Sequence, residues 1–111
     1  MAVVNQYKFV GIDDSTSGSA LTPFGSGNPL ISETYLIKSI LVTSAGTPTV
    51  TITNNSITAI KSAALSANVT TELLTQPLIV EGGKTFTVLS SSSDSFDVAI
   101  SYLNIKKEVT T

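Results

Sequence analysis

Carboxylates and hydroxyls are the groups with which this chain could do chemistry. The sequence has no His, Cys, Trp or Arg, whereas Ser and Thr each occur 16 times. The chain therefore lacks histidine as a proton shuttle, cysteine as a soft metal ligand and arginine as a bidentate ligand for anions. A serine–lysine pair is formally available, but nucleophilic catalysis needs a base in reach and an oxyanion hole, and no Gly-x-Ser-x-Gly elbow occurs. We expect that the chain is not an enzyme and carries no cofactor.

Two acidic pairs are the candidates for a metal site. Asp13 with Asp14, and Asp94 with Asp97, offer hard oxygen ligands of the kind that calcium prefers. Their spacing does not match an EF-hand loop. The first three lie in turn-rich stretches, where a short carboxylate bonds the local backbone, and Asp97 falls at an outward strand position. We therefore assign no metal site.

Charge and hydropathy exclude several classes of partner. The net charge is −2, only 13% of residues are charged, and the six Lys are spread along the chain. This is no basic patch for nucleic acid. No apolar run approaches the roughly 20 residues that span a membrane, and no secretion signal is visible. A surface poor in charge favours association, so we expect a homo-oligomer or an assembly component made in a cytoplasm.

Short segments rich in Val, Ile and Thr alternate with segments of Gly, Asn, Asp, Ser and Pro, which is typical of a fold built from strands. We expect strands at 2–10, 34–44, 49–53, 57–65, 69–74, 78–80, 85–89 and 96–105, with a hairpin turn at 81–84. A helix is the alternative for 57–65, where apolar residues also fit a 3.6 period. About eight strands at this spacing predict an all-β fold, an antiparallel β-sandwich that is jelly-roll-like.

Alternation predicts which strand positions face the core. Val50 and Ile52 are expected inward, as are Phe86 and Val88. Phe96 and Tyr102 are also expected in the core. The run 35–43 is almost continuously apolar, which predicts a central strand covered on both faces. In the first strand the phase of Tyr7 and Phe9 is the more apolar one, so we expect these two rings inward.

The chain reads as one domain with two parts. Residues 1–33 form an N-terminal arm and a long, turn-rich loop, and residues 34–111 form the sandwich body. A loop this long in a small domain is usually functional. Its apolar side chains would stay exposed to water if the loop did not dock on a surface. We therefore expect the first part to dock on this domain or on a neighbour. The candidate interface residues are Tyr7, Phe9, Leu21, Phe24, Leu30 and Ile31.

The span 34–105 resembles the small β-sandwich virion proteins of tailed bacteriophages. Three segments carry the resemblance: Tyr35-Leu36-Ile37-Lys38-Ser39-Ile40-Leu41-Val42, then Pro77-Leu78-Ile79-Val80-Glu81-Gly82-Gly83, then Val98-Ala99-Ile100-Ser101-Tyr102-Leu103. The resemblance implies a structural protein of the virion, most of all a capsid decoration (cement) protein. It also implies a homotrimer bound to the major capsid protein through protein–protein contacts.

Two alternatives stay open. The same sandwich could be a neck, tail or fibre-attachment component of the virion. It could instead be a carbohydrate- or receptor-binding module, although sugar platforms usually present exposed Trp or Tyr, and this chain has no Trp and three Tyr.

Overall fold

Two antiparallel sheets make up the fold in the computed structural model, which describes residues 2–15, 20–25, 27, 29–91 and 94–108. The described strands are β1 (Ala2–Ser15), β2 (Glu33–Ser44), β3 (Thr49–Asn54), β4 (Ile57–Ala64), β5 (Thr71–Glu72), β6 (Leu78–Val80), β7 (Phe86–Ser90) and β8 (Phe96–Glu108). The first sheet has the order β1-β8-β2, and the short strands β5 and β6 both pair with the free side of β2. The second sheet has the order β4-β3-β7. The predicted all-β sandwich is confirmed.

The connectivity is that of a jelly roll. Leu21 forms an antiparallel bridge to Val88 and thereby adds a short segment at the outer side of β7. The second sheet then runs Leu21-β7-β3-β4, facing a first sheet that runs β1-β8-β2-β5/β6. Two sheets of four segments each, connected in this order, form the double Greek-key arrangement of a jelly roll.

The core lies between the two sheets and follows the period-2 pattern of the strands. Val50 and Ile52 of β3 and Val88 of β7 are fully buried from the second sheet. The first sheet contributes the opposite wall, whose buried residues are Tyr35, Ile37, Ile40, Val42, Val80, Phe96, Val98, Ile100 and Tyr102. The predicted inward phases of β3, β7 and β8 are therefore confirmed, with Phe86, Phe96 and Tyr102 all buried.

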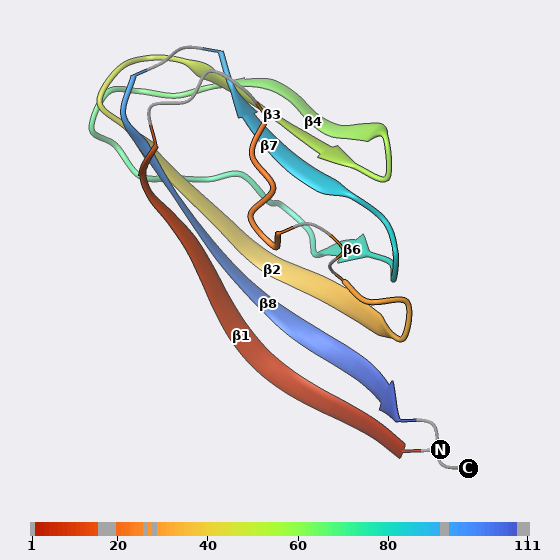
Figure 1. Cartoon of the computed structure of the whole chain (residues 1–111). Helices are drawn as coiled ribbons and strands as arrows, with labels where there is room; N and C mark the ends of the chain where they lie inside the picture. Colours follow the sequence, from red (N-terminus) through yellow and green to blue (C-terminus); the bar gives the residue numbers. More distant parts are fainter. Residues whose placement is uncertain (1, 16–19, 26, 28, 92–93, 109–111) are drawn as a thin grey trace.

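The first sheet is much longer than the second (Figure 1). β1 and β8 pair without interruption from Ala2 and Glu108 to Ile12 and Val98. Their far end, where β1 starts and β8 finishes, projects beyond β3, β4 and β7. The molecule is accordingly elongated, with principal extents of 52 × 22 × 21 Å.

The strand that starts the chain differs from its prediction in two respects. It continues to Ser15, because Gly11 pairs regularly with Ala99 and the two Asp residues fall in a register shift between Ile12 and Ser15. The expected inward placement of Tyr7 and Phe9 is wrong. These side chains are 76% and 69% exposed, and the opposite phase, with Val10 and Ile12, packs against the core. Large apolar residues occur on both phases of β1, so the position of the second sheet decided that Val10 and Ile12 are buried.

Other segments also refine the prediction. The turn at Gly82 and Gly83 exists, but the predicted hairpin is wrong, because β6 pairs with β2 and β7 pairs with β3. Residues 57–64 form the strand β4 and not a helix. The strand expected at 69–74 is reduced to two residues, β5.

Candidate interaction surface

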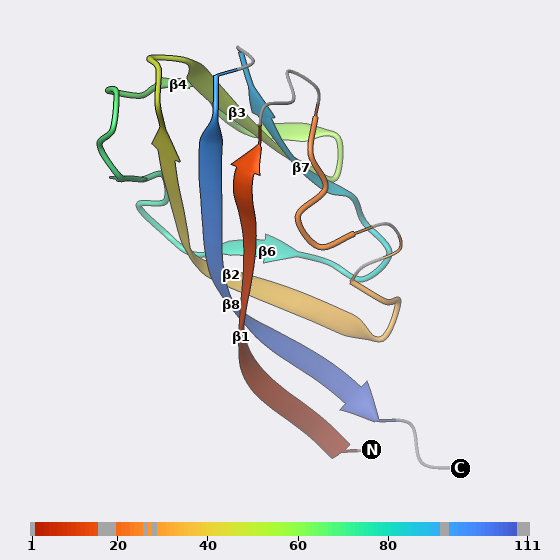
Figure 2. The same ribbon diagram turned by 60° about the vertical axis from the view of Figure 1, so that its left-hand side comes forward.

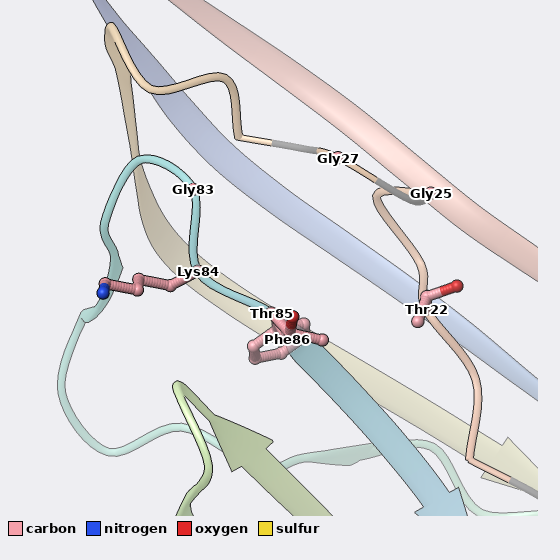
Figure 3. Close-up of a pocket in the computed structure, with 7 residues that line it drawn as sticks. All are labelled: Thr22, Gly25, Gly27, Gly83, Lys84, Thr85 and Phe86. Carbon is pink, nitrogen blue, oxygen red and sulfur yellow. The ribbon is translucent and has the colours of Figure 1, made fainter.

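The cavities of the described residues do not gather catalytic groups. One, of about 130 Å³, lies between the loop of Thr22, Gly25 and Gly27 and the start of β7. Lys84 is its one charged lining residue, and its side chain points away from Gly25 and Gly27 (Figure 3). Within the described chain, no group of three or more His, Cys, Asp or Glu residues could hold a metal ion. No described helix is long and apolar enough to cross a membrane.

The acidic candidates are split by the fold. Asp13 and Asp97 line one shallow depression of about 370 Å³ on the first sheet, together with Phe9, Gly11 and Ala99. Asp94 lies in the loop before β8, beside Gly46. The side chain of Asp14 falls outside the described residues. The depression therefore brings together Asp13 and Asp97, one carboxylate from each predicted pair, and Asp94 is not among its lining residues.

The outer face of the first sheet is the most distinctive surface of the molecule. Tyr7 of β1 is opposite Leu103 of β8, and Leu103 is opposite Leu36 of β2. Leu36 is in turn opposite Ile79 of β6. Directly paired residues of an antiparallel sheet point to the same side, so an apolar row crosses all four strands. We call this surface, with Phe9, Leu41, Ala99 and Ile105 beside the row, the outer face.

Exposure on the outer face is high for large apolar side chains. Ile79 is 55% exposed and Leu41 is 38% exposed, in addition to the two aromatic residues of β1. In Figure 2, β1 and β8 lie in front of the second sheet, which covers only the inner side. The one described cation here is Lys38, whose Nζ lies 5.7 Å from the centre of the Tyr7 ring, within range of a cation–π contact.

Two of the predicted interface residues belong to the core. Leu21 exchanges two backbone hydrogen bonds with Val88, at 2.8 and 2.9 Å. Phe24 is half-buried, with its ring 4.7 Å from Tyr35, 4.9 Å from Tyr102 and 5.4 Å from Phe86 between ring centres. These contacts close one opening of the sandwich. The loop of residues 20–25 therefore docks on its own domain.

Leu30 and Ile31 lie in the turn before β2 and are 51% and 87% exposed. This turn is held against the β6–β7 turn. The Gly83 N–H donates to the Pro29 carbonyl at 2.9 Å, and a Cβ on Gly82 would lie 2.6 to 2.8 Å from three carbonyl oxygens of residues 30, 31 and 33. The fold thus presents these two side chains on a fixed turn.

Glu33 ties that turn to the first sheet. The Asn104 amide donates to its Oε2 at 2.8 Å, and the Leu30 N–H donates to its Oε1 at 3.0 Å. Burial raises the pKa of Glu33, but these two hydrogen bonds and the charges of Lys106 and Lys8 outweigh it, so the pKa lies below its ordinary value.

The same carboxylate affects two neighbouring tyrosines. Burial, then the charge of Glu33 and the neighbouring Tyr102, raises the pKa of Tyr35 to about 12. Burial and Glu33 also raise the pKa of Tyr102. Both phenols therefore remain neutral near neutral pH, and this cluster is a structural element of the inner wall.

The outer face unites two predicted residues with others that sequence reasoning missed. Tyr7 and Phe9 were predicted for the interface, whereas Leu36, Leu103 and Ile79 were not. The signal was present: the run 35–43 predicted a strand covered on both faces, and within the described chain only one face of β2 is covered.

Comparisons with known proteins define no family. No protein-family profile matches the chain, and no curated protein matches it in sequence. One similar solved structure is described as "Bacillus endospore appendages form a novel family of disulfide-linked pili". It is 10% identical with a TM-score of 0.46, and the match covers 96% of this chain and 89% of that chain. The present chain has no cysteine.

Proposed function

We propose that this chain is a structural protein of a phage virion, and most of all a capsid decoration protein. It would act through protein–protein contact, as a homo-oligomer that binds the major capsid protein. The observation that carries this proposal is the outer face: an apolar row across four strands, without cover from the rest of the described chain. Exposed apolar patches of this kind usually mark interaction sites.

The chemistry of the surface supports a contact role over a catalytic one. Assembly by surface burial needs a rigid, apolar patch and few charges, because each buried unpaired charge costs free energy. The apolar row has both properties, since Tyr7, Leu103, Leu36 and Ile79 project from paired strands and the charged residues of the outer face, such as Lys38, Asp13 and Asp97, lie outside the row. Its position on a long sheet, away from the second sheet, leaves it accessible to a flat partner such as a shell.

Sugar binding is supported less well. The exposure of Tyr7 removes one reason against it, because an aromatic ring does lie on the surface. A sugar platform also needs hydrogen-bonding groups around the ring. The residue paired with Tyr7 is Leu103, and the next across the sheet is Leu36. A glycan array that shows strong, Tyr7-dependent binding would favour this rival.

The test is the copy number of this chain per purified virion, by quantitative mass spectrometry against the major capsid protein. Hundreds of copies support a decoration protein. A few copies, roughly three to eighteen, indicate a neck, tail or fibre component in a ring or small assembly. Absence from the particle contradicts the virion proposal. Removal of the chain should also lower the temperature at which the particle releases its DNA.

A further inference from the structure

β1 gives the first sheet one long unpaired edge. β1 pairs with β8 on one side, and no described strand lies along its other side (Figure 1). We propose that two copies of this chain pair these free edges in antiparallel fashion about a two-fold axis at Tyr7, so that the first sheet of one copy continues into the first sheet of the other. The inference stands on the edge itself and goes beyond the proposed virion role.

The other described edges are protected against such pairing, whereas the β1 edge is not. Natural sheets blunt their edges with short strands, bulges, proline or charged side chains. β5 and β6 have two and three residues, and β7 is covered by the bridge to Leu21. β4 is irregular, with two register shifts against β3 and a φ of 51° at Ser62. In contrast, β1 pairs regularly over the eleven residues Ala2–Ile12, which include no proline and one charged residue, Lys8.

Hydrogen bonds on β2 fix which backbone groups of β1 face the free edge. The Ile40 N–H donates to Glu72 Oε2 at 2.7 Å, and the Ile40 carbonyl accepts from the Leu73 N–H at 2.9 Å, so Ile40 faces away from β8. Successive residues of a strand alternate in this respect, and the register carries the alternation from β2 through β8 to β1. The N–H and C=O groups of β1 that point away from β8 belong to Val3, Asn5, Tyr7, Phe9 and Gly11.

The length of the regular stretch selects the register. Tyr7 is the middle residue of Ala2–Ile12, so an axis at Tyr7 pairs this whole stretch of one copy with that of the other. The five residues that face the free edge then form five pairs with two hydrogen bonds each, or about ten bonds in all. An axis one residue earlier or later pairs only residues 2–10 or 4–12, and the later axis places the two Lys8 side chains directly opposite each other.

The side chains that this axis brings together are compatible. Tyr7 lies opposite its own counterpart, and aromatic pairs across antiparallel strands are favourable. Asn5 lies opposite Phe9, and Gln6 lies opposite Lys8. No charged side chain of the described residues therefore lies directly opposite a like charge in the new ladder.

The charges near the axis lead to a distinctive expectation. The two Lys8 side chains are diagonal neighbours in the pair, roughly 7–8 Å apart. The Lys38 Nζ of each copy lies 5.7 Å from the centre of its own Tyr7 ring. These lysines are exposed, so salt screens their repulsion. Added salt and Lys8→Gln should each strengthen the pairing.

The same axis extends the apolar row of the outer face. A two-fold axis perpendicular to the sheet leaves the outer faces of both copies on the same side. The row runs from Ile79 through Leu36 and Leu103 to Tyr7, and Tyr7 then meets its counterpart. The row therefore continues through the axis and spans both copies. The middle of the regular stretch and the level of the apolar row coincide at Tyr7, although the two were defined by different observations.

The first test needs no substitution. Sedimentation equilibrium of the full chain, from about 1 µM to several hundred µM, should show a monomer–dimer equilibrium. Amide hydrogen exchange followed by NMR should show that the amides of Asn5, Tyr7 and Phe9 become protected as the dimer forms, whereas those of Gln6 and Lys8 are protected in both states. A monomer at all concentrations, a trimer, or a dimer in which the first three amides stay unprotected overturns the proposal.

A proline substitution tests the edge directly. Asn5→Pro removes an N–H that faces the free edge and leaves the hydrogen bonds to β8 in place, as proline on an edge strand can do. It removes two bonds from the symmetric pair, so the dimer should weaken at least roughly tenfold. The matched control is Ile79→Glu, on the outer face but three strands away from β1. A dimer that Asn5→Pro does not weaken, or that Ile79→Glu dissociates, overturns edge pairing.

A charge exchange tests the position of the axis. Tyr7→Lys and Tyr7→Glu should each weaken self-association, because like charges then lie opposite each other, and an equimolar mixture of the two variants should recover as a heterodimer. Failure of the mixture to recover overturns the axis at Tyr7. Circular dichroism checks the fold of every variant. These measurements do not involve the virion, so the pairing and the proposed function can fail separately.

Discussion

Replacement of Gly82 by alanine should destabilise the fold, because the added methyl group would meet backbone atoms of a neighbouring turn. Gly82 does not have a positive φ, so alanine is compatible with its backbone. The added Cβ, however, would lie 2.6 Å from the Ile31 carbonyl oxygen, 2.7 Å from that of Leu30 and 2.8 Å from that of Glu33. Carbon–oxygen contacts normally begin near about 3.3 Å. Three backbone atoms would therefore overlap the new methyl group at once.

The expected loss of unfolding free energy can be worked out from the backbone segment that the new methyl group would displace. Overpacking of a fixed site costs about 1–3 kcal/mol. The turn of residues 29–33 would shift off the β6–β7 turn, and the hydrogen bond from the Gly83 N–H to the Pro29 carbonyl would lengthen, at a cost of about 1 kcal/mol. The free energy of unfolding should therefore fall by about 2–4 kcal/mol. For a domain of this size, this lowers the Tm by roughly 8–16 °C.

The assay is urea unfolding followed by far-ultraviolet circular dichroism, with thermal unfolding beside it. Gly11→Ala is the control, because its Cβ would meet only the Phe9 ring at 3.3 Å and backbone at 3.4 Å, and a Gly→Ala change within a strand is close to neutral or slightly favourable. If Gly82→Ala is no more destabilising than Gly11→Ala, the close approach of the two turns is not a property of the protein in solution.

Two further predictions concern the same end of the sandwich. Phe24→Ala should lower the free energy of unfolding by about 2 kcal/mol in urea titrations, because the half-buried Phe24 ring contacts three aromatic neighbours. This is roughly half the cost of removing a fully buried Phe. An unchanged free energy of unfolding would mean that the loop of residues 20–25 is not docked. The pKa of Glu33 is lowered in the folded state, so its contribution is complete above the ordinary carboxyl range and is lost as the pH falls through the folded pKa. Stability measured from about pH 5 to pH 3 should fall less steeply in Glu33→Gln, and an identical slope would contradict this account.

The apolar residues on both faces of β2 do not show by themselves which face is buried in the folded chain. β2 has an inner phase with Ile37 and Ile40 and an outer phase with Leu36 and Leu41. A strand that is apolar on both sides normally lies between two layers. Here one layer is the second sheet, and the described chain places no second layer on the outer phase. The doubly apolar pattern of β2 therefore did not reveal that only one of its faces is covered within the described chain.

Local pattern was sufficient for much of the fold. Clean alternation in β3 predicted that Val50 and Ile52 are buried, because only one phase of that strand is apolar. Turn residues between apolar segments predicted the strand number and the sandwich class. Within the candidate site, Tyr7 and Phe9 could be chosen as aromatic residues suited to an interface.

Tertiary structure alone decided the rest. Both phases of β1 contain large apolar residues, so the orientation of Tyr7 depends on where the second sheet stops, and local sequence does not contain this distance. Gly82 and Gly83 predicted a turn, but sheet pairing determined that the turn joins two layers. The outer face exists because Tyr7, Leu103 and Leu36 lie in register although they are separated by tens of residues in the chain. Register between distant strands is set by the packing of the whole core, which is why the apolar row is visible only in the folded protein.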